Sequence, residues 1–522
     1  MSASSIEKKI SISLIENSDE AVVEQQNLEH QYTRWEAAKL YPRAAMYMLF
    51  VVFAMITVSY ENQASGVMLS IPTFRKDFGH AFGDQYVLDS KWQSAISGGP
   101  LAGVVIGCAV APSISDLIGR KNSLLISMAT TIPSVAIEFV ATSIGVFFAG
   151  KVLNSFFLGI VLTVGTMYMA EITPLALRAL GTVAISLSMC IGPLVVSIIT
   201  YGVSDRPDRW AYRSILCSQW FFGVVSLILI FFLPESPYHH LLKDNDEKAM
   251  LSLRKIYGDE EVAAKQLEIM KSGVELTRSL AAEGSFLELF DKKNLMRTII
   301  GASPFIMQSW SGLMYVAVYL TYYVQLLGFG TLKSFQVGVA AQTLSTAGAI
   351  VALIIIDRLG RRVIILFGMA SLALLNLLTA CLGMKTERPY LTAAVAFLTM
   401  FNFFYNCGIG PVAYAISTEV PTASLKGKTI SLGLVGSNSL STMWLFVLPY
   451  MFNPDEANMG SKINFIYGAA CLLSLSFFYF YLPETNGRSY EEIDEMFKRD
   501  IPARQWKGYK FENDPNNVSE KP

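Results

Sequence analysis

The chain has 522 residues, of which 52% are hydrophobic and only 16% are charged, and its formal net charge is −1. Soluble proteins carry about a quarter charged residues, so this composition is typical of a membrane protein. The balanced charge argues against nucleic acid as a partner. Six cysteines lie in apolar stretches without metal-binding or redox spacing, so we expect them to be small core residues.

Twelve apolar stretches follow a polar N-terminal tail, residues 1–43, which lacks the features of a cleavable signal peptide. Each is close to the roughly 20 residues that a membrane-spanning helix needs. The stretches lie near 44–62, 94–114, 122–141, 145–170, 180–201, 212–233, 297–326, 335–356, 362–384, 391–415, 429–450 and 463–482. We therefore predict an all-α membrane protein with twelve transmembrane helices.

The predicted helices form two groups of six. The first half covers residues 44–233 and the second covers 297–482. Between them, the polar residues 234–296 predict a linker with short amphipathic helices in water. Residues 483–522 form a second polar tail.

Three landmarks occur once in each half at near-constant spacing. DLIGRK at 116–121 returns as DRLGRR at 357–362, EITP at 171–174 as EVP at 419–421, and PES at 234–236 as PET at 483–485. This ordered repetition indicates a duplicated six-helix unit. Such duplication is typical of secondary transporters, whose substrate sites lie between the repeats.

Basic residues in the short loops predict the orientation, because cytoplasmic loops retain Lys and Arg. The loops that carry Arg120, Arg361 and their basic neighbours fall on one side, which places both termini in the cytoplasm. The sequon at 517–519 then lies in the cytoplasm and should not be glycosylated. We expect the protein to reside in the plasma membrane.

The repeated turns are candidates for a cytoplasmic gate. Glycine permits a tight reversal of the chain, and the bases can pair with the downstream glutamates or with helix C-termini. Such a network could hold the cytoplasmic side closed and break when the halves rock apart. The alternative is that these Arg and Lys residues only keep the loops on the cytoplasmic side during membrane insertion. The presence of two matched copies argues against this alternative. The candidate gate residues are Asp116, Gly119, Arg120, Glu171, Arg178, Asp357, Gly360, Arg361, Glu419 and Lys426.

Three charged residues, Glu61, Lys151 and Glu138, stand out among the few that lie within apolar stretches. A charge at the bilayer centre costs about 2.5–3.5 kcal/mol on insertion scales, so such residues usually have a role. Glu61 and Lys151 are a candidate pair in which the acid binds a proton and the base tunes it. Location at helix ends, where the cost fades, is the alternative. Glu138 has no evident partner in the sequence, and its role stays open.

Polar and aromatic side chains in the second half could line a substrate cavity. Amides suit the hydroxyl groups of sugars, and aromatic faces suit their C–H faces. Each residue alone is more often a contact between helices, and the hypothesis depends on their clustering. The candidate substrate-binding residues are Gln308, Trp310, Tyr315, Asn402, Asn406, Asn438 and Trp444.

Sequence motifs of enzymes do not stand out. The chain has no Walker loop, no H-E-x-x-H and no G-x-S-x-G. The four histidines lie outside the apolar stretches, and we interpret His239 and His240 as a surface pair. We therefore expect no enzymatic activity, no cofactor and no metal site. The expected partners are a small-molecule substrate, protons and the lipid bilayer, and we expect a monomer.

Together these motifs resemble the sugar porters of the major facilitator superfamily, in particular the fungal α-glucoside (maltose) permeases. The resemblance extends over most of the chain, including GP at 410–411, PYMFNP at 449–454 and GRSYEE at 487–492. It implies twelve helices, alternating access and, often, proton-coupled uptake.

Several positions depart from the family pattern. Pro193 replaces the glutamine that usually follows glycine in the fifth helix. Met314 stands where the seventh-helix pattern ends in asparagine, and Leu434 replaces an arginine of the eleventh helix. Loss of amides leaves fewer partners for hydroxyls, and a site built on hydrogen bonds discriminates through them. Uptake of an α-glucoside therefore competes with transport of a less polar metabolite, such as export of a secondary product, and with a non-transporting nutrient sensor.

Overall fold

The computed structural model describes residues 36, 39–82, 85–174, 177–281, 286–385, 387–422, 425–453, 455–485, 490–499 and 501–508. The side chains of three predicted gate residues, Arg178, Asp357 and Lys426, lie outside the described part.

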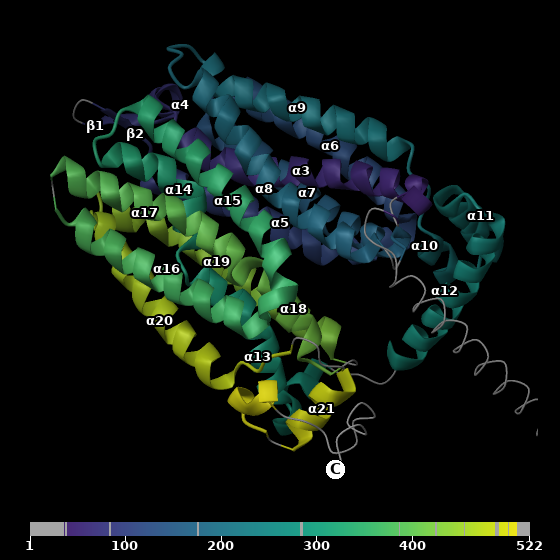
Figure 1. Cartoon of the computed structure of the whole chain (residues 1–522). Helices are drawn as coiled ribbons and strands as arrows, with labels where there is room; N and C mark the ends of the chain where they lie inside the picture. The colour runs from purple at the N-terminus through teal and green to yellow at the C-terminus, as the bar shows by residue number, and fades with distance from the viewer. Residues whose placement is uncertain are drawn as a thin grey trace, which may run out of the picture.

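The helices form two bundles that lie side by side, one purple to blue and the other green to yellow in Figure 1. The first consists of α3 (Pro42–Leu69), α5 (Ser90–Ile118), α6 (Arg120–Val140), α7 (Ile144–Ile172), α8 (Arg178–Val203) and α9 (Trp210–Phe231). The second consists of α13 (Lys292–Ser309) with α14 (Leu313–Leu326), α15 (Thr331–Leu359), α16 (Arg361–Gly383), α17 (Arg388–Cys407) with α18 (Ile409–Glu419), α19 (Lys426–Phe452) and α20 (Ile463–Tyr481). The prediction of twelve spans in two six-helix halves is confirmed.

Two of the spans are broken, which the sequence did not predict. The seventh is interrupted between α13 and α14, where Gly312 has φ +96°, a conformation that favours glycine. The tenth is interrupted between α17 and α18 at Gly408. Of the described helices, eleven spans are long and apolar enough to cross a membrane by composition alone, and the divided seventh span is the twelfth. Broken helices in transporters are tolerated where they line a cavity.

The repeated turns lie between α5 and α6 and between α15 and α16, and we call this end of the molecule the turn end. Gly119 has φ +96° and Gly360 has φ +86°, so each provides a left-handed reversal that an L side chain rarely adopts. A Cβ at either glycine would also collide with a glutamate carboxylate, that of Glu235 or Glu484. These two glycines therefore allow each turn to lie close to the glutamate that follows the last helix of the same half.

Contacts between the halves are found at the opposite end. Arg75 Nη2 donates to Gln325 Oε1 at 2.8 Å, and Ser94 Oγ donates to the carbonyl of Phe446 at 2.8 Å. Asn453 Nδ2 lies 2.8 Å from Ser90 Oγ. The short helix α4 (Pro72–Phe78) and the antiparallel hairpin of β1 (His80–Phe82) and β2 (Gln85–Val87) lie at this end as well.

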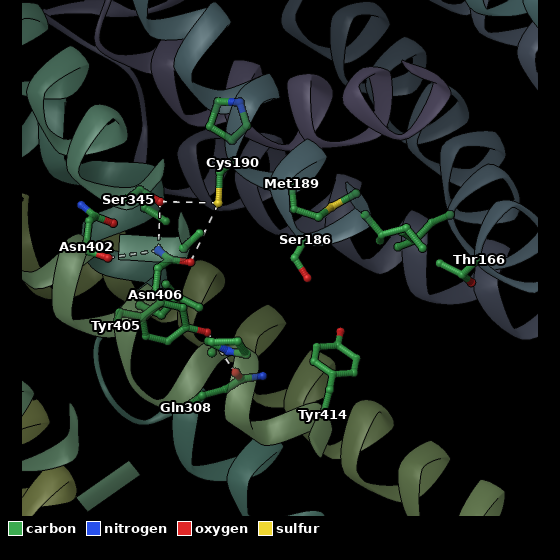
Figure 2. Close-up of a pocket in the computed structure, with 18 of the residues that line it drawn as sticks. Thr166, Ser186, Met189, Cys190, Gln308, Ser345, Asn402, Tyr405, Asn406 and Tyr414 are labelled. Carbon is green, nitrogen blue, oxygen red and sulfur yellow. Dashed lines mark hydrogen bonds between the residues drawn. The ribbon is translucent and has the colours of Figure 1, made fainter. Parts of the chain in front are cut away.

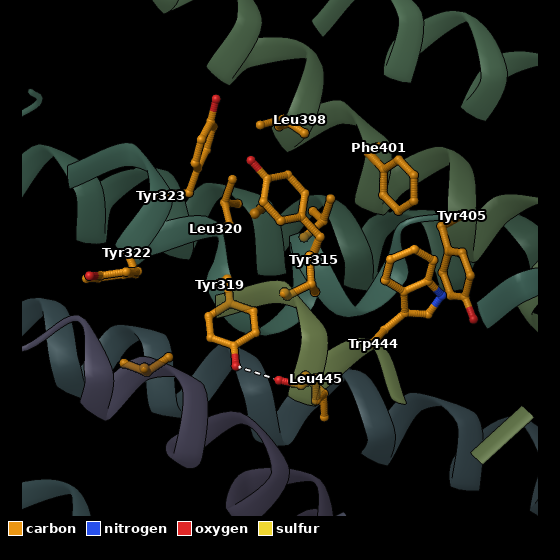
Figure 3. Close-up of a cluster of buried hydrophobic side chains, with 14 of the residues drawn as sticks. Tyr315, Tyr319, Leu320, Tyr322, Tyr323, Leu398, Phe401, Tyr405, Trp444 and Leu445 are labelled. Atoms are coloured by element: carbon orange, nitrogen blue, oxygen red, sulfur yellow. Dashed lines mark hydrogen bonds between the residues drawn. The ribbon is translucent and has the colours of Figure 1, made fainter. Parts of the chain in front are cut away.

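Helix α14 contributes a stripe of tyrosines to the core of the second half (Figure 3). Tyr315, Tyr319, Tyr322 and Tyr323 are all buried, and the i, i+4, i+7 and i+8 spacing brings them to one helix face. Tyr319 donates to the carbonyl of Leu445 at 3.1 Å. This stripe packs the broken seventh span against its neighbours.

The linker forms α10 (Pro237–Leu242), α11 (Asp246–Tyr257), α12 (Glu260–Ala281) and the 3-10 turn η2 (Phe286–Phe290). Asn245 caps α11 by accepting the N–H of Lys248 at 3.2 Å. A short 3-10 turn, η3 (Gly460–Lys462), precedes α20. After α20, the chain forms α21 (Tyr490–Lys498) and then the 3-10 turn η4 (Ala503–Gly508). Both the linker and the C-terminal segment lie at the turn end.

The cysteines only partly match the prediction of core residues. Cys190, Cys407 and Cys471 are buried, whereas Cys381 is exposed on α16. An exposed thiol on an apolar span is consistent with contact with lipid.

Candidate transport cavity and buried charge cluster

A cavity of about 600 Å³ lies between the two halves (Figure 2). The first half contributes side chains from α3, α7 and α8, and the second half contributes them from α13, α14, α15, α17 and α18. The lining extends from Gln63 and Gln308, within the bundle, to Thr173 at the end of α7 and Tyr414 on α18. The cavity therefore reaches toward the turn end, whereas the halves contact each other at the opposite end.

Amide groups of the second half form the polar wall of this cavity. The hydroxyl of Tyr405 donates to Gln308 Oε1 at 2.9 Å. Asn406 Nδ2 donates to Ser345 Oγ at 2.9 Å and to the carbonyl of Asn402 at 3.0 Å. The Nδ2 of Asn402 is buried and has no protein partner in the described structure. These groups can donate hydrogen bonds to a ligand and accept them from it.

The predicted substrate-binding residues divide into two sets. Gln308, Asn402 and Asn406 line the cavity. The structure places the remaining four outside the described lining, and they are Trp310, Tyr315, Asn438 and Trp444.

The orientation of the helix faces explains why these candidates lie outside the described lining. Tyr315 is buried next to Tyr323 (Figure 3) and also packs against Tyr467. Trp444 is in contact with Trp310 and Tyr467. The sequence shows that an aromatic residue lies in a membrane span but not which face of the helix turns toward the cavity. Aromatic residues of the core therefore could not be distinguished from substrate-binding residues.

Sequence reasoning missed several lining residues. Gln63, Gln342 and Ser345 are polar residues in apolar spans, and that signal could have identified them. Met189 and Cys190 of α8 carry no such signal. Of the departures from the family pattern, Pro193 lines the cavity, whereas Met314 and Leu434 are not among its lining residues.

The predicted pair of Glu61 and Lys151 forms inside the first half. Lys151 Nζ lies 2.8 Å from Glu61 Oε1 and 2.9 Å from Oε2. Gln219 Nε2 of α9 donates to Glu61 Oε2 at 2.8 Å. The side chain of Lys151 is 0% exposed and that of Glu61 is 1% exposed, so both charges are removed from water.

Glu138 of α6, which had no evident partner in the sequence, also belongs to this cluster. Its Oε2 lies 3.2 Å from Lys151 Nζ, and its side chain is fully buried. One ammonium group therefore faces two carboxylates. When all three groups are ionised the cluster carries a net charge of −1, and uptake of one proton would neutralise it.

At the turn end, Arg120 is the centre of a network within the first half. It is 2% exposed, and its Nη1 donates to Asp116 Oδ1 at 2.9 Å. Its Nε donates to Glu171 Oε1 at 3.2 Å, and Ser236 Oγ donates to the other oxygen of Glu171. The network therefore joins α5, α6 and α7 to the start of the linker.

The second half repeats this arrangement. Arg361 Nη2 donates to Glu419 Oε1 at 3.2 Å, and Thr485 Oγ1 donates to Glu419 Oε2 at 2.5 Å. Glu484 accepts the backbone N–H groups of Arg361 and Arg362 at 2.9 and 3.2 Å. In the first half, Glu235 accepts the N–H of Arg120 at 2.7 Å in the same way. These pairs join helices of one half, and they are intact although the cavity reaches this end.

The interpretation of His239 as a surface residue is wrong. His239 is 5% exposed, and its Nδ1 lies 3.2 Å from Arg120 Nη1. The histidine lies on α10, which folds back against the repeated turn, and such long-range packing has no local sequence signal. Burial lowers the pKa of His239 below the ordinary histidine value, and Lys243, Arg120 and His240 lower it further, against Glu235. The imidazole is therefore suited to accept the hydrogen bond as a neutral group.

Solved structures with the same architecture are known. The inward-open structure of the xylose transporter XylE from E. coli matches with a TM-score of 0.71 and 20% identity, covering 86% of this chain and 98% of that one. The proton:xylose symporter XylE bound to 6-bromo-6-deoxy-D-glucose matches with a TM-score of 0.68 and 18% identity, covering 87% and 99%. Two six-helix halves around a central cavity, with broken seventh and tenth spans, define a secondary transporter of the major facilitator type.

The sequence matches the family model of the sugar (and other) transporters over residues 46–497, so this chain belongs to that family. Among characterised relatives, a general alpha-glucoside permease of Saccharomyces cerevisiae is 28% identical over 490 residues, which are 92% of this chain and 79% of the permease. The maltose permease MAL61 of the same yeast is 27% identical, covering 91% and 79%. A major facilitator-type transporter of Aspergillus rugulosus, ecdD, is 27% identical and covers 90% of both chains.

Proposed function

We propose that this transporter takes up an α-glucoside or a related sugar together with protons, by alternating access. The observation that carries the proposal is the pairing of an amide-lined cavity between the halves with a buried cluster of two carboxylates and one ammonium group. The names of the yeast relatives, permeases for α-glucosides and maltose, support the substrate class. The name of the bacterial symporter supports coupling to protons.

Gln308, Asn402 and Asn406 are the groups that would bind the sugar. Their donors and acceptors lie in one wall of the cavity, next to the hydroxyl of Tyr405. A volume of about 600 Å³ is within the range of small-molecule sites. A buried polar group without a hydrogen-bond partner costs free energy. A ligand rich in hydroxyl groups would therefore bind this wall better than an apolar ligand.

Glu61 would carry the transported proton, and the charges of Lys151 and Glu138 would tune its affinity for that proton. A proton from one side of the membrane would bind the Glu61 carboxylate and give a neutral carboxylic acid, which weakens its attraction to Lys151. Release of that proton to the other side would restore the ion pair. Gln63 follows Glu61 by two residues on α3 and lines the cavity. Its side-chain amide donates to the carbonyl of Ala317 in the second half at 3.1 Å. Helix α3 is therefore a direct route from the charge cluster to the contact between the halves.

The turn end would face the cytoplasm, with both termini on that side and the protein in the plasma membrane. The structure then corresponds to a state open to the cytoplasm. The networks around Arg120 and Arg361 would brace each half, and additional contacts between the halves would form when this end closes. Asp116, Glu171, Glu419 and the two glycines would act with them, and Arg178, Asp357 and Lys426 remain predicted members.

The experiment that tests this proposal is uptake of a panel of radiolabelled sugars, including maltose and other α-glucosides, in a host without its own sugar uptake. We expect accumulation of at least one α-glucoside, which a protonophore abolishes. The empty host is the control. Absence of uptake across the panel would overturn the sugar assignment, and uptake that only equilibrates, with no effect of the protonophore, would overturn proton coupling.

A further inference from the structure

A hollow of about 460 Å³ at the turn end of the first half is separate from the transport cavity. Its wall is made by the turn between α5 and α6, the segment after α9, and helices α10 and α11. Four lysines and two histidines are among the twelve residues that line it. They are Lys121, Lys243, Lys248, Lys255, His239 and His240.

In the described lining of this hollow, four lysines face a single carboxylate. Glu235 is the one carboxylate in the described lining, and it already accepts the backbone N–H groups of Arg120, Lys121 and Ser236 at 2.7, 3.1 and 3.0 Å. Lys243 Nζ donates to the carbonyl of Leu117 at 2.9 Å. Within the described part of the chain, none of the four lysines is within ion-pair distance of a carboxylate. The hollow is therefore strongly positive.

Burial and the nearby lysines both affect the pKa of the two histidines in this hollow. Burial is the main cause that lowers the pKa of His240 below its ordinary value, and Lys248 and Lys243 lower it further, whereas Glu235 opposes them. The same is true of His239, with Lys243 and Arg120 among the causes. Both imidazoles can thus act as neutral hydrogen-bond partners beside the ammonium groups.

Apolar side chains next to the hollow place it at the surface of the membrane. Leu117 is 73% exposed and Phe231 is 66% exposed, although both lie at the ends of membrane-spanning helices. Lys121 Nζ lies 5.5 Å from the centre of the Phe231 ring. Exposed apolar residues on a span face lipid, and basic residues at the end of a span lie at the level of the headgroups.

At the same corner of the second half, the corresponding base is bound by the chain itself. Arg362 occupies the position of Lys121 in the repeated turn, and it donates to the carbonyls of Tyr479 at 2.7 Å and Ala503 at 3.3 Å. The segment η4 also places Arg504 over the rings of Tyr479 and Phe480. In the second half protein oxygens thus accept hydrogen bonds from both terminal nitrogens of the base, whereas the Lys121 ammonium has no such oxygen within hydrogen-bond distance in the described structure.

We propose that the basic hollow of the first half binds the phosphorylated headgroup of an anionic phospholipid. The phosphate oxygens would accept hydrogen bonds from Lys121, Lys248 and Lys255, and the acyl chains would lie along Leu117 and Phe231. Clusters of four or more basic residues beside a membrane span attract anionic headgroups in this way. Because His239 contacts both this hollow and Arg120, bound lipid would also stabilise the network of the repeated turn. This inference does not depend on which sugar is transported.

Lipid binding by the purified full-length protein in detergent tests the proposal, measured by native mass spectrometry. The probes are phosphatidylinositol 4-phosphate, phosphatidylcholine, free inositol phosphate and inorganic phosphate. The test variant is K121Q/K248Q/K255Q, which removes the three proposed phosphate donors. The control is K265Q/K292Q/K462Q, which removes three exposed lysines elsewhere and changes the net charge equally. Thermal unfolding of both variants checks that the fold is retained.

We expect the wild type and the control to bind the anionic lipid in preference to phosphatidylcholine. Each lysine near an anionic surface contributes roughly a fivefold factor in affinity, so the test variant should bind about a hundredfold more weakly. Equal binding by the test and control variants would overturn the site. Binding of free inositol phosphate or inorganic phosphate as tight as that of the lipid would overturn the assignment to a membrane lipid.

Discussion

The two halves share the repeated turn but differ in what they hold within the membrane. The first half contains the buried cluster of Glu61, Glu138 and Lys151. The second half supplies the amides of Gln308 and Asn406 to the cavity. Duplication therefore provides a symmetric frame, and under the proposed function the two tasks of a coupled transporter belong to different halves. The account predicts that substitutions in the first half impair coupling and those in the second half impair substrate affinity.

The largest effect is expected from Lys151→Met. This substitution leaves two carboxylates buried without a cation. Removal of one partner from a buried ion pair destabilises the folded protein by about 3–5 kcal/mol. Accumulation of sugar should therefore be lost, since an intramembrane charge usually has a functional role. The Lys151→Arg variant keeps the charge and is the matched control. Uptake assays at equal surface expression would test this, and near-normal accumulation by Lys151→Met would refute a coupling role for the cluster.

A smaller effect, on affinity, is expected from Gln308→Leu and Asn406→Leu. Loss of a hydrogen bond to a buried ligand group costs about 1–3 kcal/mol, so the KM for sugar should rise about tenfold. Tyr315→Phe is the control, since Tyr315 lies in the aromatic core rather than in the cavity lining. Initial-rate measurements over a range of sugar concentrations distinguish them. A larger rise in KM for Tyr315→Phe than for Gln308→Leu would reverse our assignment of helix faces.

The two networks at the turn end should differ in stability. Arg120 is almost fully buried and contacts Asp116, Glu171 and His239, whereas the side chain of Arg361 is partly exposed. We expect Arg120→Gln to lower the free energy of unfolding by about 3 kcal/mol and Arg361→Gln by about 1 kcal/mol. For a chain of this length, 1 kcal/mol corresponds to roughly 1–2 °C in the unfolding temperature. Thermal unfolding in detergent measures both, and a larger loss for Arg361→Gln would contradict the comparison.

The smallest effect concerns pH. Burial lowers the pKa of His239, so the unfolded chain binds a proton there more readily than the folded one. Stability should therefore fall as the pH drops through the ordinary histidine value of about 6.5. The groups that face His239 are Arg120, Glu235, Lys243 and His240. Between pH 7.5 and 5.5 the unfolding temperature of the wild type should fall about 1 °C further than that of His239→Gln. An equal fall in both would contradict this role.

Much of the fold could be predicted from the sequence because hydropathy and the repeated landmarks are local signals. The breaks at Gly312 and Gly408 could not be, since glycine in a span is compatible with a straight, kinked or broken helix. The ion pair of Glu61 and Lys151 was predictable from the cost of burying charge. Glu138 lacked a partner in the sequence because its partner comes from the next helix, at a register that only packing determines. Tyr315 and Trp444 were assigned to the substrate for a similar reason, since composition does not reveal which helix face meets the cavity.

The most direct test of the division between the halves is sugar-driven proton uptake in proteoliposomes, measured beside sugar exchange for the wild type and Glu61→Gln. In this variant Lys151 still has Glu138 as a partner, so the two ionised groups that remain carry no net charge. We predict that Glu61→Gln exchanges sugar across the membrane but moves no protons with it, while the wild type does both. Proton uptake by Glu61→Gln at the wild-type rate would contradict the central claim that the first half carries the proton.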